Sequence, residues 1–173
     1  MTGLGIEFEV RIIKGIDESY PSDAKMQQIP MYISQQKANA YRTTMAPDEL
    51  IITADTIVWL DGEVMGKPKT REQAIEMLTS LSGHCHQVVT GVTLLTKDKE
   101  HSFSCTTDVY FCQLRPEEIE YYVDTYKPYD KAGAYGIQEW IGYIGVERIE
   151  GSYFNVMGLP VQRLYRELKQ FTE

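Results

Sequence analysis

Hydrophobic and polar residues alternate with two different periods along this chain, which predicts a succession of strands and helices. Residues 6–13 (IEFEVRII) alternate apolar and polar side chains, which is the period of a half-buried strand. A polar segment follows and is expected to be a loop, and Pro30 then suits the first turn of a helix through MYISQQKANAYR. Residues 49–60 (ELIITADTIVWL) are rich in β-branched side chains and predict a buried strand that closes at the turn Asp61-Gly62.

The second half of the chain carries clear signals for element boundaries. Thr70 and Gln73 form a capping-box pattern ahead of the helix REQAIEMLTSL, and Gly83 ends that helix. The segments HQVVTGVTLLT and SFSCTTDVYFCQL are joined by the charged turn KDKE, which predicts an antiparallel hairpin. Further helices are expected after Pro116 and Pro160, with a short strand near IGVERIE between them. Helices combined with a hairpin indicate an α/β fold with a mixed, twisted sheet.

Composition and charge narrow the class of protein. A chain of 173 residues with 43% hydrophobic residues is expected to form one domain, or one domain with two lobes. Its formal net charge of −8 argues against nucleic acid or an anionic membrane as a partner, since both require a basic surface. Neither a membrane-spanning run nor a signal peptide is expected from the sequence. Three irregularly spaced cysteines favour a reducing cytoplasm over a disulfide framework or a zinc site.

Two segments hold the residue types that phosphate chemistry needs. Asp55 follows the apolar run LII, where we expect the strand to end, and ligands of open α/β sheets bind at such ends. An acid in that place either caps a turn or is stabilised by a charged partner or a metal. Lys131 lies among the small residues of YDKAGAYGIQ, which allow a ligand to approach the backbone. An acid and a lysine of this kind together indicate metal-assisted phosphate chemistry.

Other polar residues are open to two interpretations. Lys67 lies in the loop GKP and is either a ligand of the substrate or an ordinary solvated lysine. Lys37 lies in the middle of a predicted helix and by itself indicates only a surface lysine. Asp17 and Glu18 either bind a cation or form a solvated turn. The triplet His-Cys-His at 84–86 places two histidines on one face of a strand, but without a third ligand it indicates the polar start of that strand.

The order of six motifs along the chain resembles one known family. GIDES, QKANA, ADTIVWLDGEVMGKP, LSGHCHQVVTGV, DKAGAYGIQ and VERIEGSYFNVMGLP occur in the sequence and spacing of the Maf-like nucleotide pyrophosphatases. The similarity extends over essentially the whole chain. It implies a fold like that of the inosine triphosphate pyrophosphatases, in which residues 1–173 form a single domain with two lobes around a central cleft.

The resemblance also implies an activity. Family members hydrolyse nucleoside triphosphates between the α and β phosphates, and they require a divalent metal cation, Mg²⁺ or Mn²⁺. Within the family, ADT together with DKAGAYGIQ resembles the branch that acts on dTTP and UTP, and on modified pyrimidine triphosphates. The role implied is the cleaning of the cytoplasmic nucleotide pool, and a homodimer is the assembly that the resemblance implies.

Individual residues inherit expected roles from this resemblance. Asp55 matches the catalytic acid and a metal ligand, and Glu18 matches a second acid of the cleft and metal ligand. Thr56 and Gln138 match the positions linked to base selection, and the Gln138 amide offers both a donor and an acceptor to a uracil or thymine edge. Three lysines match the substrate-binding residues of the cleft: Lys37, Lys67 and Lys131.

The chain departs from the family pattern at its beginning. Family members carry a strand and an SxSPRR motif upstream of the position of LGIEF, and the serine and arginines of that motif contact the phosphates. Residues 1–4 match the helix that follows the motif, so the resemblance implies that the strand and these ligands are missing. Two alternatives therefore stay open. One is a nucleotide-binding regulatory protein linked to septum formation with little or no turnover, and the other is an enzyme for purine or 7-methylguanine nucleotides.

Overall fold

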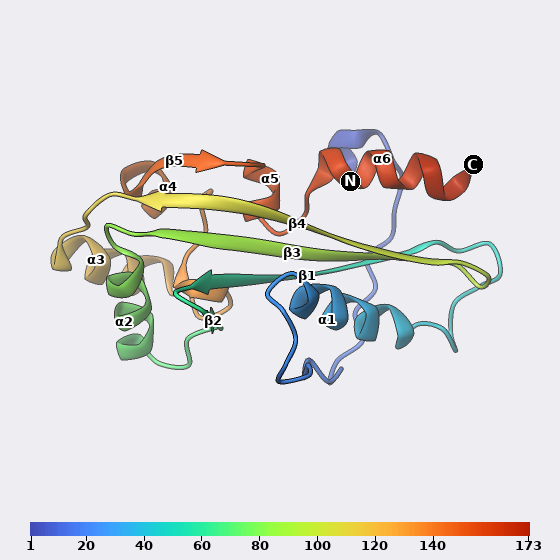
Figure 1. The fold of residues 1–173 in the computed structure, drawn as a ribbon, viewed down its shortest axis with the longest axis horizontal. Helices are drawn as coiled ribbons and strands as arrows, with labels where there is room; N and C mark the ends of the chain where they lie inside the picture. The colour runs from blue at the N-terminus through green and yellow to red at the C-terminus, as the bar shows by residue number, and fades with distance from the viewer. The chain divides into compact units, whose positions relative to one another are not determined.

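A computed structural model describes residues 1–173, and Figure 1 shows the order of its elements along the chain. The chain divides into two compact units, each built from segments that are distant in sequence. The first unit contains Met1–Asp55, Thr90–Cys105 and Gly158–Glu173. The second unit contains Thr56–Val89 and Thr106–Met157.

The strands form one five-stranded sheet in the order β2-β1-β3-β4-β5. The pair β1–β2 is antiparallel, as is the pair β4–β5, and the arrows in Figure 1 alternate in direction from strand to strand. The α/β class is therefore confirmed, with a sheet that is antiparallel rather than mixed. The strands are β1 (Ile51–Leu60), β2 (Glu63–Met65), β3 (Cys85–Leu95), β4 (Glu100–Phe111) and β5 (Val146–Glu150).

The helices start and stop largely where the sequence signals place them. Thr70 Oγ1 accepts a hydrogen bond from the Gln73 backbone N–H at 3.2 Å, so the Thr70 N-cap of the predicted capping box is confirmed. The Gln73 side chain instead accepts from the Lys69 backbone N–H at 2.8 Å, so the second half of the box does not form. None of the helices is both long enough and apolar enough to cross a membrane. The helices are α1 (Gln28–Asn39), α2 (Arg71–Leu81), α3 (Pro116–Tyr126), α4 (Trp140–Gly145), α5 (Tyr153–Val156) and α6 (Val161–Thr172), with short 3₁₀ helices η1 (Thr2–Leu4) and η2 (Ala132–Ala134).

Residues 6–13 do not form a strand, so that prediction is wrong. The segment belongs to none of the five strands of the sheet. Its apolar side chains at Phe8, Val10 and Ile12 are 52%, 73% and 78% exposed. Alternation gives a strand only where a neighbouring strand accepts the backbone hydrogen bonds and another layer covers the apolar face. This segment has neither.

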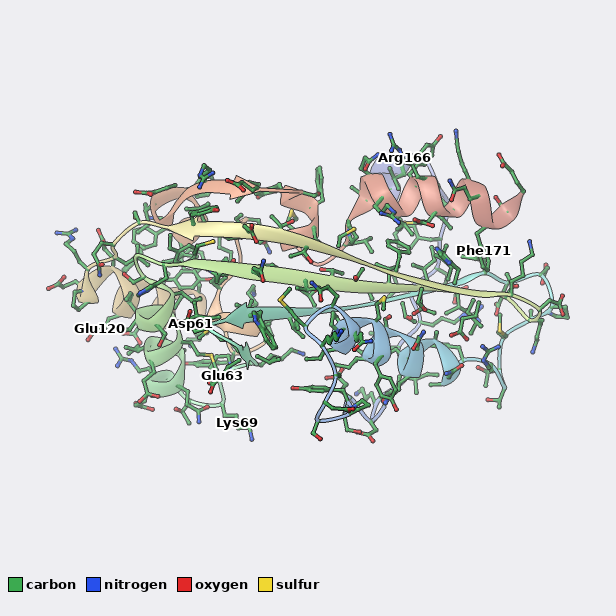
Figure 2. All side chains as sticks on the ribbon, in the orientation of Figure 1. Asp61, Glu63, Lys69, Glu120, Arg166 and Phe171 are labelled. Carbon is green, nitrogen blue, oxygen red and sulfur yellow. The ribbon has the colours of Figure 1, made fainter.

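The strand that carries Asp55 extends beyond this acid, up to the turn predicted at Asp61-Gly62. β1 is continuous through Ile51–Leu60, so Asp55 lies in its middle and not at its end, as the sequence had indicated. The strand continues because Ile57 and Val58 after the acid are buried. It closes at the predicted turn, from which the side chains of Asp61 and Glu63 project (Figure 2).

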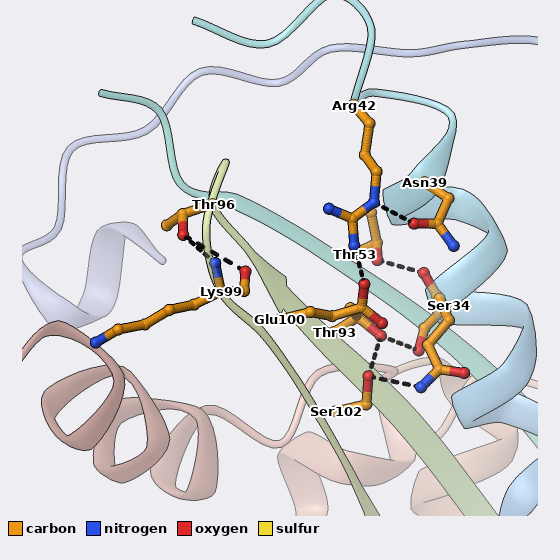
Figure 3. Close-up of polar contacts among 10 residues, drawn as sticks. Ser34, Asn39, Arg42, Thr53, Thr93, Thr96, Lys99, Glu100 and Ser102 are labelled. Atoms are coloured by element: carbon orange, nitrogen blue, oxygen red, sulfur yellow. Dashed lines mark hydrogen bonds and ion pairs between the residues drawn. The ribbon is translucent and has the colours of Figure 1, made fainter. Parts of the chain in front are cut away.

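Helix α1 packs on the sheet through close backbone contact and hydroxyl groups. A Cβ atom built on Gly91 of β3 would lie 2.3 Å from the Met31 nitrogen, so only glycine fits beneath the helix. Ser34 of α1 shares a hydrogen bond of 2.8 Å with Thr93 of β3. The Thr53 hydroxyl donates to the Ser34 carbonyl at 2.6 Å, and Figure 3 shows these contacts together. The hydroxyl contacts thus anchor the helix that carries Lys37.

A buried histidine lies in the hydrophobic core of the second unit. His86 is 1% exposed, and its Nε2 is 2.7 Å from the hydroxyl of Tyr135. Its ring packs edge-on against Phe111 and Tyr135. The other ring nitrogen, Nδ1, has no hydrogen-bond partner, so the fold supplies no acceptor for a second proton. Burial accordingly lowers the pKa of His86 to about 4.

Because the pKa of His86 is lowered in the folded protein, we expect the protein to lose stability in acid. The unfolded chain binds the proton near the ordinary histidine pKa of 6.5, and the folded chain binds it only near 4. The contribution is therefore fully present above pH 6.5 and is lost as the pH falls towards 4, on the order of 3 kcal/mol in total. Urea unfolding at a series of pH values measures it. His86→Gln should remove most of this acid dependence, and an unchanged slope in that variant would contradict the assignment.

Candidate functional site

The first unit brings three of the expected site residues into contact. Lys37 lies in the last turn of α1, and its Nζ is 2.6 Å from Asp55 Oδ1 on β1. The same Nζ is 3.0 Å from Glu18 Oε1, on the loop before α1. The Asp55 side chain is 14% exposed and that of Glu18 is 51% exposed. A lysine that looks like a surface residue in sequence thus joins the two carboxylates.

The negative charges of Asp55 and Glu18 outnumber the positive charge of Lys37 in this cluster. Burial alone would lower the pKa of Lys37, but the hydrogen bonds and charges of Asp55 and Glu18 outweigh it and hold that pKa above its usual value. Lys37 is therefore an ammonium ion at neutral pH. One positive charge between two carboxylates leaves an excess of negative charge, which attracts a cation.

The chemistry of these donors fits a divalent metal ion. Carboxylate oxygens are the ligands that Mg²⁺ prefers, and proteins commonly hold Mg²⁺ through one or two carboxylates with substrate phosphates completing its shell. Asp55 and Glu18 supply two carboxylates that converge on one atom, the Nζ of Lys37. No group of three or more His, Cys, Asp or Glu side chains gathers as a metal site anywhere in the chain. A cation here would therefore depend on the substrate for further ligands.

The neighbouring acid Asp17 has a different role from Glu18. Its carboxylate accepts hydrogen bonds from the Ser19 backbone N–H at 2.9 Å and from the Ser19 hydroxyl at 2.8 Å. These bonds hold the pKa of Asp17 below its usual value. Asp17 therefore forms the turn that the sequence allowed as an alternative, and Glu18 lies within this turn.

The second unit contains another lysine between two carboxylates. Lys131 Nζ is 3.0 Å from Asp130 Oδ1 and 3.3 Å from Glu139 Oε1. The other oxygen of Glu139 accepts a hydrogen bond from the hydroxyl of Tyr122. That hydroxyl also accepts a hydrogen bond from the Gly136 backbone N–H at 3.1 Å. Tyr122 thus connects the partner of Lys131 to the backbone of the loop DKAGAYGIQ.

These contacts are partly shielded from solvent. Tyr122 is fully buried, and burial followed by the hydrogen bond to Glu139 raises the pKa of its hydroxyl far above the usual range. Burial alone would lower the pKa of Lys131, but Asp130 and Glu139 together raise it. Lys131 and Tyr122 therefore keep their protons at neutral pH.

Gln138 and Lys131 lie against the same point of the backbone. A Cβ atom built on Gly136 would be 3.0 Å from Lys131 Cε and 3.2 Å from Gln138 Nε2. The two side chains are thus neighbours over a residue that has no side chain of its own. Gln138 is exposed to solvent. Both polar tips can reach the same ligand.

For Lys67 and Thr56, the structure gives the position in the fold and fewer side-chain contacts than for the other expected site residues. The Gly133 N–H donates to the Gly66 carbonyl at 3.1 Å, so the loop of Lys67 contacts the loop of Lys131. The charge of Lys67 also helps to hold the pKa of Asp130 low, although the hydrogen bond from Lys131 does more. Thr56 follows Asp55 in β1, and successive side chains of a strand point to opposite faces.

Sequence reasoning missed two residues of the second cluster. Neither Tyr122 nor Glu139 carried a motif signal of its own. They are 17 residues apart and meet through the hydroxyl–carboxylate bond. The signal that could have found them is the burial of a tyrosine on α3, because a buried phenol generally has a hydrogen-bond partner. His86 of the His-Cys-His triplet bonds Tyr135 instead of converging with other ligands, and all three cysteines are free.

Known proteins of one family match this chain along almost its whole length. A family model described as "Maf-like protein" matches residues 1–171. A dTTP/UTP pyrophosphatase of Parabacteroides distasonis is 63% identical over 171 residues, which are 99% of this chain and 89% of the relative. Proteins of the same name from Phocaeicola vulgatus and Porphyromonas gingivalis are 63% and 51% identical, over 98% and 100% of this chain and 88% of each relative.

Proposed function

Since this chain belongs to the Maf-like protein family, we propose that it hydrolyses dTTP and UTP to the nucleoside monophosphate and pyrophosphate. Relatives at 63% identity carry the name of that activity. The single observation in the structure that supports it best is the Lys37 ammonium between Asp55 and Glu18, at 2.6 and 3.0 Å. This arrangement combines a carboxylate base, a positive charge for the phosphates and a place for a divalent cation.

Each residue of the cluster has a distinct task in this proposal. Asp55 accepts a proton from the attacking water as the bond between the α and β phosphates breaks. Lys37 fixes the Asp55 carboxylate in position and neutralises charge that develops on the phosphate oxygens. Asp55 and Glu18 would hold a divalent cation, which supplies charge neutralisation and lowers the pKa of bound water when present. Lys67 is proposed as a further phosphate ligand, because its side chain is exposed and its loop contacts that of Lys131.

Product analysis tests the proposed activity directly. The chain is incubated with Mg²⁺ and, separately, with dTTP, UTP, CTP, ATP, GTP and 7-methyl-GTP. Monophosphate and pyrophosphate from dTTP and UTP are expected, while free phosphate would indicate cleavage of a different bond. Tight nucleotide binding without pyrophosphate release would contradict the proposal and favour the regulatory alternative. Chelation of the metal should stop turnover, and readdition of Mg²⁺ or Mn²⁺ should restore it.

Gln138 is proposed as a reader of the base, with Thr56 as a second specificity position. Gln138→Ala removes a donor and an acceptor that pair with uracil or thymine, and each lost hydrogen bond weakens recognition by about tenfold. We therefore expect the preference for dTTP over dGTP to fall by at least about tenfold, with little change in pyrophosphate inhibition. Measured kcat/KM ratios for the two substrates check this. An unchanged ratio would show that Gln138 does not read the base.

The proposal extends to the cellular setting. A pyrophosphatase for dTTP, UTP and modified pyrimidine triphosphates would act on the nucleotide pool, which places it in the cytoplasm. The acidic net charge of −8 supports a protein that binds neither nucleic acid nor membranes. A homodimer is proposed as its assembly, and large exposed side chains such as Tyr143, which is 82% exposed, are compatible with a subunit interface. Light scattering of the purified chain measures the assembly.

A further inference from the structure

Lys131 has an electrostatic surrounding that does not suit a triphosphate. Its ammonium group carries three N–H bonds, and the carboxylates of Asp130 and Glu139 lie within 3.0 and 3.3 Å. One positive charge therefore faces two negative charges. Both oxygens of Glu139 already contact protein donors, the Lys131 ammonium and the Tyr122 hydroxyl. Even with the nearby charge of Lys67, the two lysines only balance the two carboxylates, so the cluster has no excess positive charge to offer a triphosphate, and Glu139 is not arranged as a metal ligand.

A neutral base with carbonyl groups suits this lysine better. After its two carboxylate contacts, Lys131 has one N–H left to donate. Its side chain lies beside the amide of Gln138, over Gly136, so both can address one ligand edge. Uracil and thymine present two carbonyl acceptors with an N–H donor between them. Lysine can donate to the 4-carbonyl, while the glutamine amide pairs with the N–H and the 2-carbonyl.

Lysine also supplies a discrimination that glutamine lacks. An amide carries a donor and an acceptor, and it can rotate to pair with either uracil or cytosine. An ammonium group has donors only, so it cannot pair with the amino group that cytosine presents where uracil has a carbonyl. When cytosine enters such a site, its amino group and the lysine ammonium are two donors that face each other without an acceptor. The site therefore rejects cytosine.

We propose that Lys131 reads the pyrimidine base together with Gln138, and that Glu139, fixed by the Tyr122 hydroxyl, positions Lys131 for this task. The Tyr122 hydroxyl also holds the Gly136 N–H at 3.1 Å, which fixes the backbone between the two reading side chains. This inference rests on the proposed function for its substrate class. It differs from the phosphate-binding role that the sequence indicates for Lys131.

Binding of uncleavable nucleotides tests the inference without turnover. Calorimetry with Mg²⁺ measures the affinities of α,β-imido-dTTP, α,β-imido-dCTP and inorganic pyrophosphate. Lys131→Met should lower the dTTP-to-dCTP affinity ratio by about tenfold, while pyrophosphate affinity stays within about twofold. Lys69→Met is the matched control, because it removes an exposed lysine of the same unit whose ammonium group forms no hydrogen bond or ion pair within that unit (Figure 2). It should leave the ratio unchanged.

Tyr122→Phe tests the positioning role without changing any charge. It removes the hydroxyl that holds Glu139 and Gly136, so the dTTP-to-dCTP ratio should fall in the same direction as in Lys131→Met. A purely structural defect would instead lower the fraction of binding-competent protein and leave the affinity ratio intact. The fitted stoichiometry separates the two effects.

Two results would overturn the inference. The first is a Lys131→Met variant that loses pyrophosphate, dTTP analogue and dCTP analogue affinity equally, which would make Lys131 a phosphate ligand. The second is a wild-type chain that binds both analogues equally well. A wild-type chain that discriminates between the analogues but releases no pyrophosphate from dTTP would instead contradict the proposed activity and leave base reading supported.

Discussion

Asp55→Asn is expected to lower pyrophosphate release from dTTP by about a thousandfold while the protein stays folded. The substitution removes the carboxylate that accepts the proton and holds the cation, and general-base and metal contributions are each large enough to account for the loss. Asparagine has nearly the same volume, and its Oδ1 can still accept a hydrogen bond from Lys37. Steady-state pyrophosphate release and a thermal melt by circular dichroism measure the two quantities.

Asp61→Asn is the matched control for this experiment. Asp61 lies at the turn after β1, is exposed, and has a φ of 49°, a conformation that asparagine tolerates well. This variant removes one carboxylate from the same stretch of chain without touching the Lys37 cluster, so its turnover should equal that of the wild type. Full turnover in Asp55→Asn would exclude Asp55 as the catalytic acid, and equal losses in both variants would point to a general effect of charge.

Gly91→Ala is expected to destabilise the protein by about 3 kcal/mol. The added methyl group would lie 2.3 Å from the Met31 nitrogen and 2.4 Å from the Pro30 carbonyl oxygen, and backbone atoms cannot yield as flexible side chains do. For a chain of this length the melting temperature should fall by roughly 6–12 °C. Urea unfolding gives the free energy. Gly3→Ala is the control, because a Cβ atom there meets nothing within 4 Å.

Gly91 also connects stability to the site. The residue sets how closely α1 approaches β3, and α1 carries Lys37. If Gly91→Ala lifts the helix, the Lys37–Asp55 contact lengthens and turnover should fall even where the variant is fully folded. A variant that is as stable as the wild type would show that the helix can shift without cost, which would contradict the packing argument.

The sequence predicted elements best where a local signal decides them. The N-cap at Thr70 and the hairpin turn between β3 and β4 depend on residues within a few positions of one another, and both are confirmed. Residues 6–13 failed because a strand requires a partner elsewhere in the chain. Asp55 was misplaced within its strand because an acid interrupts the apolar run of β1 without ending it.

In the candidate site, too, contacts between residues that are distant in sequence were the hardest to predict. The residue pattern alone indicated Asp55 and left a cation-binding role open for Glu18, whereas Lys37 was indicated only by the family resemblance. The structure places the three in contact. Their catalytic and metal-binding roles stay predictions. The contact between Tyr122 and Glu139 could not be predicted, because it depends on the path of an irregular loop in which Gly133 and Ala134 have φ of 66° and 60°.

The hydroxyl contacts under α1 affect how the attachment of this helix responds to temperature. Ser34, Thr53 and Thr93 add polar contacts beside the apolar side chains that α1 buries. Detachment of α1 alone would expose the few apolar side chains that it buries, such as Ile29 and Ile33, which is far less apolar surface than unfolding of the whole domain exposes. The heat-capacity change of unfolding scales with that surface. The free energy that holds Lys37 beside Asp55 should therefore vary less steeply with temperature than the stability of the whole domain. The hydroxyl contacts would then help to retain the site geometry on cooling, where attachment by hydrophobic packing weakens.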